Sequence, residues 1–404
     1  MKIIFSYTKD NSIIIRRCLS PSGEVTVPAF INNRPVTELA PYAFSRSELV
    51  MYDNAFIFDT DDLSVRACSP DREAEIDKSE EVICERLLSI SLPRTLLKVG
   101  RYCFYGCEKL SSISMYSTTI DLGFGMFTGC TGVRNLDMTV TEGVRSSLND
   151  VLVNIRFPLK LTYREAYREN NSSGDSAAPI YPERVAPSDL SGDLLPECNN
   201  IGIGGIDSFE QTDREGALST QAPGEKAPVK YRLIFPEYYE NSKENTPARI
   251  TVRDMQGSGY MYRNCFANTM FQIKRYDSLF SYAEALEPEE TVCELALCRL
   301  ETPCDLSEEA EEKYISYLKF HSKKFTELLI RHYESDEISM SRLKELASMD
   351  FVTEDYSSKM TEAAMELKNP EVLSVLMDLR HERFGLKEKD TEKERSPRKR
   401  RFSL

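Results

Sequence analysis

The sequence predicts an α+β protein, in which a short solenoid of parallel strands precedes a small β-containing domain and an α-helical module. Three observations support this prediction. A pattern of apolar, aromatic and thiol side chains recurs at a constant interval between positions 88 and 140. A long stretch poor in apolar residues then separates two segments with alternating polarity. From Pro288 onward the apolar residues follow the period of a helix.

The 23-residue repeat is the strongest signal in the chain. Ile90 recurs as Ile113 and Leu136, and Phe104 recurs as Phe127. The other repeated pairs are Gly106 and Gly129, Cys107 and Cys130, and Leu110 and Val133. Because five independent positions keep one spacing, the pattern indicates a structural repeat.

The spacing within one repeat predicts a coil with an apolar interior. Ile90 and Leu92 alternate with serines, so a short strand places both on one face. Phe104 would point into the coil, and Gly106 would allow a tight bend before the small buried thiol of Cys107. One coil cannot bury its apolar face alone, so stacked coils are expected to share a core.

An earlier coil precedes the regular repeats. Val25 takes the place of Ile90 there, and Phe44 takes the place of Phe104. The interval from Phe44 to Phe104 is not a multiple of the regular repeat length. We therefore expect one irregular coil that carries an insertion, the acidic run at residues 71–77.

These motifs resemble a known repeat family. The matching segments are Val27-Pro28 with Tyr42-Ala43-Phe44, and Leu92-Pro93 with Cys103-Phe104-Tyr105-Gly106-Cys107 and Leu110. They resemble the BspA-type leucine-rich repeats of bacteria, in which a strand and a proline precede an I-G-x-x-A-F-x-G-C-x-x-L turn. The segment Tyr116–Thr119 lacks the usual proline. The resemblance covers roughly residues 20–140. It implies a leucine-rich-repeat solenoid over residues 1–140 that binds proteins, although many relatives are surface proteins.

The middle of the chain predicts a small β-containing domain at 141–164 and 228–285. Val151–Tyr163 is interpreted as one or two strands, and Val229–Pro236 as another strand that pairs with them. Between them, residues 165–227 are dominated by Ser, Gly, Pro, Asp and Glu. Such a composition buries too little apolar surface to offset the entropy of ordering, so a flexible low-complexity insertion is expected.

A cluster of Tyr, Arg and Met beside flexible glycines suggests a recognition patch. Tyr260, Tyr262 and Arg263 are the candidate partner-binding residues, because these residue types are enriched in binding hot spots. An aromatic turn within a core would have the same composition. Both interpretations stay open at this point.

Residues 286–385 predict an α-helical interaction module. Ser307 and the acidic residues after it favour a helix start, and Asn369-Pro370 suits the N-cap and first turn of the last helix. Helical segments around Met360–Leu367 and Asn369–Leu376 resemble a degenerate ankyrin-like hairpin, without the opening motif of that repeat.

The sequence contains no pattern typical of a catalytic, metal or cofactor site. Its three histidines (His321, His332 and His381) lie in expected helices and not at metal-ligand spacing from any cysteine. Eleven cysteines, an odd number, fit free thiols in a reducing compartment. A Cys–His nucleophile whose partners meet only in space stays open.

Charge and hydropathy limit the possible partners. The net charge of −14 disfavours general nucleic-acid binding. Residues 386–404 are expected to be a disordered basic tail, either solvated or docked on an acidic partner or nucleic acid. No apolar stretch reaches the roughly 20 residues of a membrane helix, and the run Ile3–Tyr7 is too short for a secretion signal.

We therefore expect a cytoplasmic, non-catalytic scaffold or adaptor that binds protein partners without a cofactor. One alternative is an exported, adhesin-like repeat protein. The other is an enzyme whose site lies between the solenoid and the helical module.

Overall fold

The structure is a computed structural model that describes residues 1–46, 54–68, 80–166, 227–245 and 250–385. The strands are β1 (Lys2–Tyr7), β2 (Ile13–Leu19), β3 (Glu24–Thr26), β4 (Phe30–Ile31), β5 (Arg34–Leu39), β6 (Phe56–Asp59), β7 (Val65–Ala67), β8 (Ser89–Ser91), β9 (Lys98–Val99), β10 (Ser112–Tyr116), β11 (Asp121–Leu122), β12 (Asn135–Thr141), β13 (Leu159–Ala166), β14 (Val229–Phe235), β15 (Tyr239–Asn245), β16 (Ile250–Gln256), β17 (Phe266–Ala267) and β18 (Met270–Phe271). The helices are α1 (Leu148–Asn154), α2 (Gly259–Arg263), α3 (Ile273–Ser278), α4 (Phe280–Leu286), α5 (Glu289–Glu301), α6 (Glu308–Phe320), α7 (Ser322–Glu334), α8 (Met340–Ala347), α9 (Glu354–Glu366) and α10 (Pro370–Phe384).

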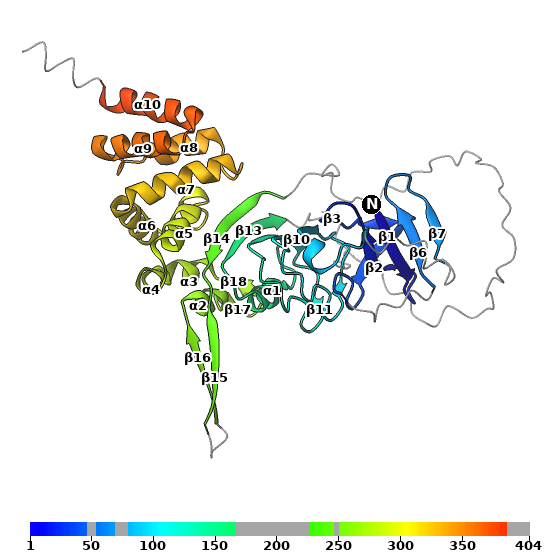
Figure 1. The fold of residues 1–404 in the computed structure, drawn as a ribbon. Helices are drawn as coiled ribbons and strands as arrows, with labels where there is room; N and C mark the ends of the chain where they lie inside the picture. Colours follow the sequence, from blue (N-terminus) through cyan, green and yellow to red (C-terminus); the bar gives the residue numbers. More distant parts are fainter. Residues whose placement is uncertain (47–53, 69–79, 167–226, 246–249, 386–404) are drawn as a thin grey trace, which may run out of the picture. The chain divides into compact units, whose positions relative to one another are not determined.

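A six-stranded sheet with the order β14-β13-β12-β10-β8-β3 forms one wall of the solenoid (Figure 1). Its strands are parallel except for the last pair, β13 and β14. Ile113 lies between Ile90 and Leu136 in the register of neighbouring strands, and all three side chains are buried. The predicted solenoid and its repeat register are therefore confirmed.

A second sheet, with the order β11-β9-β5-β2-β1-β6-β7, includes the other side of the coils. Strands β5, β9 and β11 are its short parallel members, one from each successive coil. The antiparallel hairpin β1–β2 continues this sheet at the N-terminal end, where β2 pairs with β5. The first strand predicted at Ile3–Tyr7 is thus part of an antiparallel hairpin beside the coils.

Aromatic rings stack along the interior between the two sheets. The ring centroids of Phe44 and Phe104 are 5.3 Å apart, and those of Phe104 and Phe127 are 5.7 Å apart, with the planes nearly parallel in both pairs. Because Phe44 lies directly on Phe104, the chain between them contributes one coil plus an insertion, as expected. The hairpin β6–β7 belongs to this insertion and pairs with β1. The acidic run at 71–77 lies outside the described residues.

The predicted tight bends before the buried thiols are present. Gly106 and Gly129 have φ values of 75° and 81°, a region that favours glycine. Cys107 and Cys130 follow them into the core, where both are buried. Leu110 and Val133 complete the repeated turn and are also fully buried.

The strand expected to begin at Val151 is instead helix α1, so this part of the prediction was wrong. Leu148, Val151, Leu152 and Ile155 are buried and have the i, i+3, i+4, i+7 spacing of a helical face. Their β-branched and apolar character favours strands locally, but burial of one helical face against the solenoid prevails.

The solenoid sheet also continues beyond the expected boundary at residue 140. Strand β13 pairs in parallel with β12 and places Leu161 beside Leu136. The predicted pairing of the two strands that flank the insertion is present, because β14 pairs antiparallel with β13. These two strands form the end of the six-stranded solenoid sheet. Nearly all of the predicted insertion lies outside the described residues.

After β14 come the antiparallel hairpin β15–β16, helix α2 and the short pair β17–β18, and helices α3 to α10 then continue to the end of the described chain (Figure 1). Helix α5 packs on β14, and α6 and α7 pack on α5. Ser307 caps α6 by accepting a hydrogen bond from the Ala310 backbone, and Asn369 caps α10 in the same way through Val372. The expected tail at 386–404 lies outside the described residues. The described part of the chain contains no helix with both the length and the apolar composition that a membrane span requires.

Candidate functional site

One side of the six-stranded sheet presents rows of polar side chains. Since neighbouring strands are in register, one row runs through Ser89, Ser112, Asn135 and Lys160, and the next through Ser91, Ser114, Asp137 and Thr162. The serines are partly exposed, and Arg164 donates a hydrogen bond to Asp137 at 2.8 Å. The backbone groups of the central strands pair with each other, so a partner would meet mainly side chains on this face.

A second surface feature is a group of four aromatic residues, Tyr42, Tyr102, Tyr105 and Phe124, which we call the aromatic ladder; Tyr42 and Tyr102 are partly buried, whereas Tyr105 and Phe124 are exposed. Tyr102 is at its centre, with its ring centroid 5.5 Å from that of Tyr42 and 5.8 Å from those of Tyr105 and Phe124. The exposed fractions of Phe124 and Tyr105 are 79% and 49%.

The ladder arises from the stacking of successive coils. The Tyr102 backbone N–H donates to the Phe124 carbonyl at 3.0 Å, and the Tyr42 N–H donates to the Arg101 carbonyl at 3.2 Å. The next coil has Gly125 at the repeat position of Tyr102, where a Cβ would lie 2.6 Å from the Tyr102 ring. The sequence analysis missed this ladder, although Tyr-Ala-Phe at 42–44 and Tyr-Cys-Phe at 102–104 share its pattern.

Of the three predicted partner-binding residues, two are buried. Tyr262 is fully buried and its ring lies 4.8 Å from that of Tyr276, while Arg263 is 1% exposed. Only Tyr260, at 40% exposed, reaches the surface, where it packs against Tyr238. The core-turn interpretation therefore describes Tyr262 and Arg263, and their assignment to a partner surface is corrected.

The buried Arg263 guanidinium joins the end of the solenoid to helix α2. It donates to the carbonyls of Leu152 (3.2 Å) and Ile155 (2.8 Å) at the end of α1, and to that of Phe157 (2.7 Å). It also donates to the carbonyls of Pro236 and Gly259. Burial lowers the pKa of Arg263 to about 10, so the group stays protonated at neutral pH. A cation at a helix C-terminus is electrostatically favourable there.

A network of charged side chains, which we call the polar joint, connects the sheet to α5 and α7. Its members are Lys160 and Arg232 from the sheet, Glu294 and Glu301 from α5, His332 from α7, and Glu337. His332 Nδ1 lies 2.5 Å from a Glu301 oxygen, and Lys160 Nζ lies 3.5 Å from His332 Nε2. With His332 protonated, three cations balance three carboxylates.

Electrostatics in the polar joint favour the charged forms of His332, Lys160 and Glu294. Burial opposes protonation of His332, but its interactions with Glu294 and Glu301 outweigh burial and raise its pKa. Burial likewise opposes the charge on Lys160, and the negative groups around it, Glu337 among them, raise its pKa overall. For Glu294, the neighbouring His332 and Lys160 overcome burial and lower the pKa.

The free edge of strand β14 is closed by hydroxyl groups. Tyr276 Oη accepts from the Ile234 N–H at 3.0 Å and donates to the Ile234 carbonyl at 2.7 Å, as a strand residue would. Thr302 Oγ1 accepts from the Arg232 N–H at 2.9 Å. These contacts satisfy backbone groups that would otherwise offer an edge for pairing with another chain.

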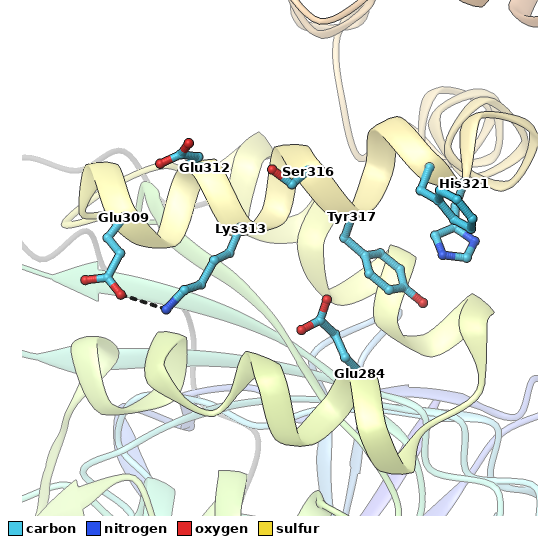
Figure 2. A pocket seen from close by; sticks show the side chains of 8 residues that line it. Glu284, Glu309, Glu312, Lys313, Ser316, Tyr317 and His321 are labelled. Carbon is cyan, nitrogen blue, oxygen red and sulfur yellow. Dashed lines mark hydrogen bonds and ion pairs between the residues drawn. The ribbon is translucent and has the colours of Figure 1, made fainter.

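An acidic groove of about 540 Å³ lies between α4 and α6. It is lined by Glu284, Glu309, Glu312, Lys313, Ser316, Tyr317, Phe320 and His321. Figure 2 shows Lys313 paired with Glu309, whereas the Glu284 carboxylate extends from α4 toward Tyr317. Phe320 is 85% exposed at its rim.

The described thiols have the properties of core residues. Eight of the ten described cysteines are buried, and burial raises the pKa of Cys265 to about 12. Burial also raises the pKa of Cys293 to about 12 and that of Cys298 well above its usual value. An activated nucleophile requires a lowered thiol pKa, so these environments do not favour thiol catalysis.

Two groups of side chains within the described residues have the donor types of a metal site. One is Glu289, Cys293 and His321, and the other is Cys298, Glu301 and His332. In each group the donor atoms lie within 4.8 Å of one another. Sequence spacing could not reveal either group, because its histidine comes from a different part of the chain than its cysteine.

One comparison with known proteins, a match to a family model, supports the repeat. A family model described as a BspA-type leucine-rich repeat region matches residues 77–168 in six copies. The crystal structure of the T. pallidum leucine-rich repeat protein TpLRR is similar at 20% identity and a TM-score of 0.23, covering 34% of this chain and 51% of that one. The chain thus spans about half the length of that protein. A search of curated proteins finds no match. The family match confirms the repeat type over these residues, and such repeats indicate a role in protein interaction.

Proposed function

We propose that this chain is a non-catalytic protein-binding scaffold that contacts its principal partner through the aromatic ladder. The observation that carries the proposal is the exposure of Phe124 and Tyr105, which flank Tyr102 on the surface of stacked coils. Aromatic side chains supply large contact areas and dominate the energy of many interfaces.

The rigid backbone beneath the ladder supports this function. The ring-bearing turns are joined to neighbouring coils by backbone hydrogen bonds such as Tyr42 N–H to Arg101 and Tyr102 N–H to Phe124, so little freedom is lost when a partner binds. The polar outer sheet face, with Ser112 and Ser114 at its centre, would contribute hydrogen bonds around such a contact. The helical module would hold a second partner, consistent with its resemblance to an ankyrin-like hairpin.

We further propose that the scaffold works in the cytoplasm. The support is chemical: the exposed Cys304 is a thiol, and so are the buried cysteines Cys103, Cys107 and Cys130 of the solenoid core. Thiols persist in reducing compartments, whereas oxidising ones favour disulfides. An exported, adhesin-like role is the alternative, and fractionation of the source cells separates the two.

Affinity purification with matched variants tests the proposed surface. Wild-type chain, the double variant Tyr105→Ser/Phe124→Ser and the control Phe320→Ser would each be used as bait in lysate of the source cells. Phe320 is a good control because it is 85% exposed but lies outside the ladder. Quantitative mass spectrometry is expected to show a partner that the wild type and the control retain and that the double variant loses at least about tenfold. Equal recovery by all three baits would overturn the proposal.

A further inference from the structure

We propose that Glu289, Cys293 and His321 form a zinc-binding site at the edge of the acidic groove. The three donor atoms lie within 4.8 Å of one another, although they come from helix α5 and from the junction between α6 and α7. The donor set of one carboxylate oxygen, one thiolate sulfur and one imidazole nitrogen suits Zn²⁺, which is borderline soft.

The backbone positions these donors from two directions. Glu289 and Cys293 are one helical turn apart in α5, so they lie on the same face of that helix. His321 lies between α6 and α7, as the C-cap of the first and the N-cap of the second, and its backbone N–H donates to the Tyr317 carbonyl at 3.2 Å. Its ring stacks on the Tyr317 ring with centroids 4.3 Å apart, which limits its rotation.

The existing contacts are close to a coordination geometry. His321 Nδ1 lies 2.9 Å from a Glu289 carboxylate oxygen. Small side-chain rotations would bring the donors to the roughly 2.0–2.3 Å of zinc bonds. As the S–Zn bond forms, the Cys293 thiol would release its proton to solvent. Glu289 is 54% exposed, so an ion can enter from the surface.

The groove supplies a further ligand position. Tyr317 and His321 both line it, and so does Glu284, for which the described residues offer no hydrogen bond or ion pair. Figure 2 shows the Glu284 carboxylate directed toward Tyr317. The Tyr317 pKa is raised to about 12 by burial and then by Cys293, Glu289 and Glu284. Water from the groove can complete a tetrahedral site.

The charge around this cluster distinguishes it from the Cys298, Glu301 and His332 group. There the Lys160 ammonium lies 3.5 Å from His332, and Glu301 is already paired with His332 and Arg232. The positive charge of Lys160 would oppose the binding of a metal cation in the Cys298, Glu301 and His332 group. At Cys293 the neighbouring cation, Lys324, is paired with Glu290 and Glu327, and no ion pair of Lys324 with Glu289 occurs within the described residues.

Cobalt titration of the full, reduced and metal-free chain tests the site. Co²⁺ takes the place of Zn²⁺, and a thiolate ligand produces a sulfur-to-cobalt charge-transfer band. We expect one equivalent to bind with this band and to be displaced by Zn²⁺. Cys293→Ser should abolish the band, and His321→Asn and Glu289→Gln should each weaken binding at least about tenfold.

Cys298→Ser is the matched control, because Cys298 is equally buried on the same helix and belongs to the other donor group. It should keep both the band and the affinity. A second measurement is the thermal unfolding midpoint, which Zn²⁺ should raise in the wild type and in Cys298→Ser but not in His321→Asn. The proposal is overturned if the wild type shows no thiolate band, or if Cys298→Ser rather than Cys293→Ser removes it.

Discussion

The ring of Phe104 stacks on the ring of Phe127, with centroids 5.7 Å apart and planes 14° from parallel. The two residues occupy the same position in successive repeats, so this contact joins neighbouring coils. Because each coil buries its apolar face only against its neighbours, such contacts carry the stability of a solenoid.

Phe104→Ala should therefore destabilise the chain by about 3–5 kcal/mol, since it removes a buried ring between Phe44 and Phe127. Urea unfolding followed by circular dichroism measures this change. Tyr105→Ala, at the next position but 49% exposed, should change the free energy of unfolding by less than about 1 kcal/mol. Equal changes in unfolding free energy for Phe104→Ala and Tyr105→Ala would contradict an apolar interior shared by successive coils.

Gly123→Ala should be destabilising because the new Cβ would lie 2.3 Å from the backbone nitrogen of Arg101 in the preceding coil. Backbone cannot rotate away as a side chain can, so a loss of about 1–3 kcal/mol or more is expected by urea unfolding. Gly143→Ala is the control, since its Cβ would have no atom within 4 Å and only its φ of 72° is unfavourable. A larger loss of unfolding free energy in Gly143→Ala than in Gly123→Ala would contradict close packing of the coils as the cause of the Gly123→Ala effect.

Arg263→Met, which removes the link between the end of the solenoid and α2, should lower the free energy of unfolding by about 4 kcal/mol. The substitution leaves five buried carbonyls without the guanidinium that donates to them. Arg263→Lys should retain little of the stability that arginine provides, because one ammonium group cannot reach all five carbonyl acceptors. Arg46→Met, at an exposed ion pair, should cost less than about 1 kcal/mol. Unfolding midpoints that are unchanged by Arg263→Met would contradict this role.

The contribution of His332 to the free energy of unfolding should depend on pH. The pKa of His332 is higher in the folded protein than in the unfolded chain, where it is about 6.5. Its stabilising effect is therefore fully present below the pKa of the unfolded chain and is lost as pH rises through the pKa of the folded protein. The difference in unfolding free energy between wild type and His332→Asn should therefore be largest near pH 5.5 and smaller near pH 8.5. A difference that grows with pH would have the wrong sign for a protonated His332 between Glu301 and Glu294.

The sequence predicted the solenoid because its signal is periodic: Ile90, Ile113 and Leu136 keep one spacing and occupy adjacent strands. It could not place α1, because Val151 and Leu152 have the local character of strand residues while tertiary packing decides their conformation. The end of the repeat was missed for the same reason, since α1 replaces the Phe-Gly-Cys turn before β13.

The sites depend on contacts between distant segments, which composition does not encode. Tyr262 and Arg263 have the composition of a binding patch, but the carbonyls at the end of α1 draw the Arg263 side chain into the core. Similarly, Cys293 and His321 lie far apart in the sequence and meet only because α5 and the α6–α7 junction pack together. Residue type alone therefore could not distinguish an exposed contact from a buried one.

Site-specific photo-crosslinking tests most directly whether the aromatic ladder is the contact surface. A benzoylphenylalanine side chain would replace Phe124 in one sample and Leu63, which is 72% exposed and outside the ladder, in another. On illumination in lysate we predict a discrete protein adduct at position 124 and none at position 63. Adducts of equal yield at both positions, or an adduct at position 63 alone, would contradict the assignment.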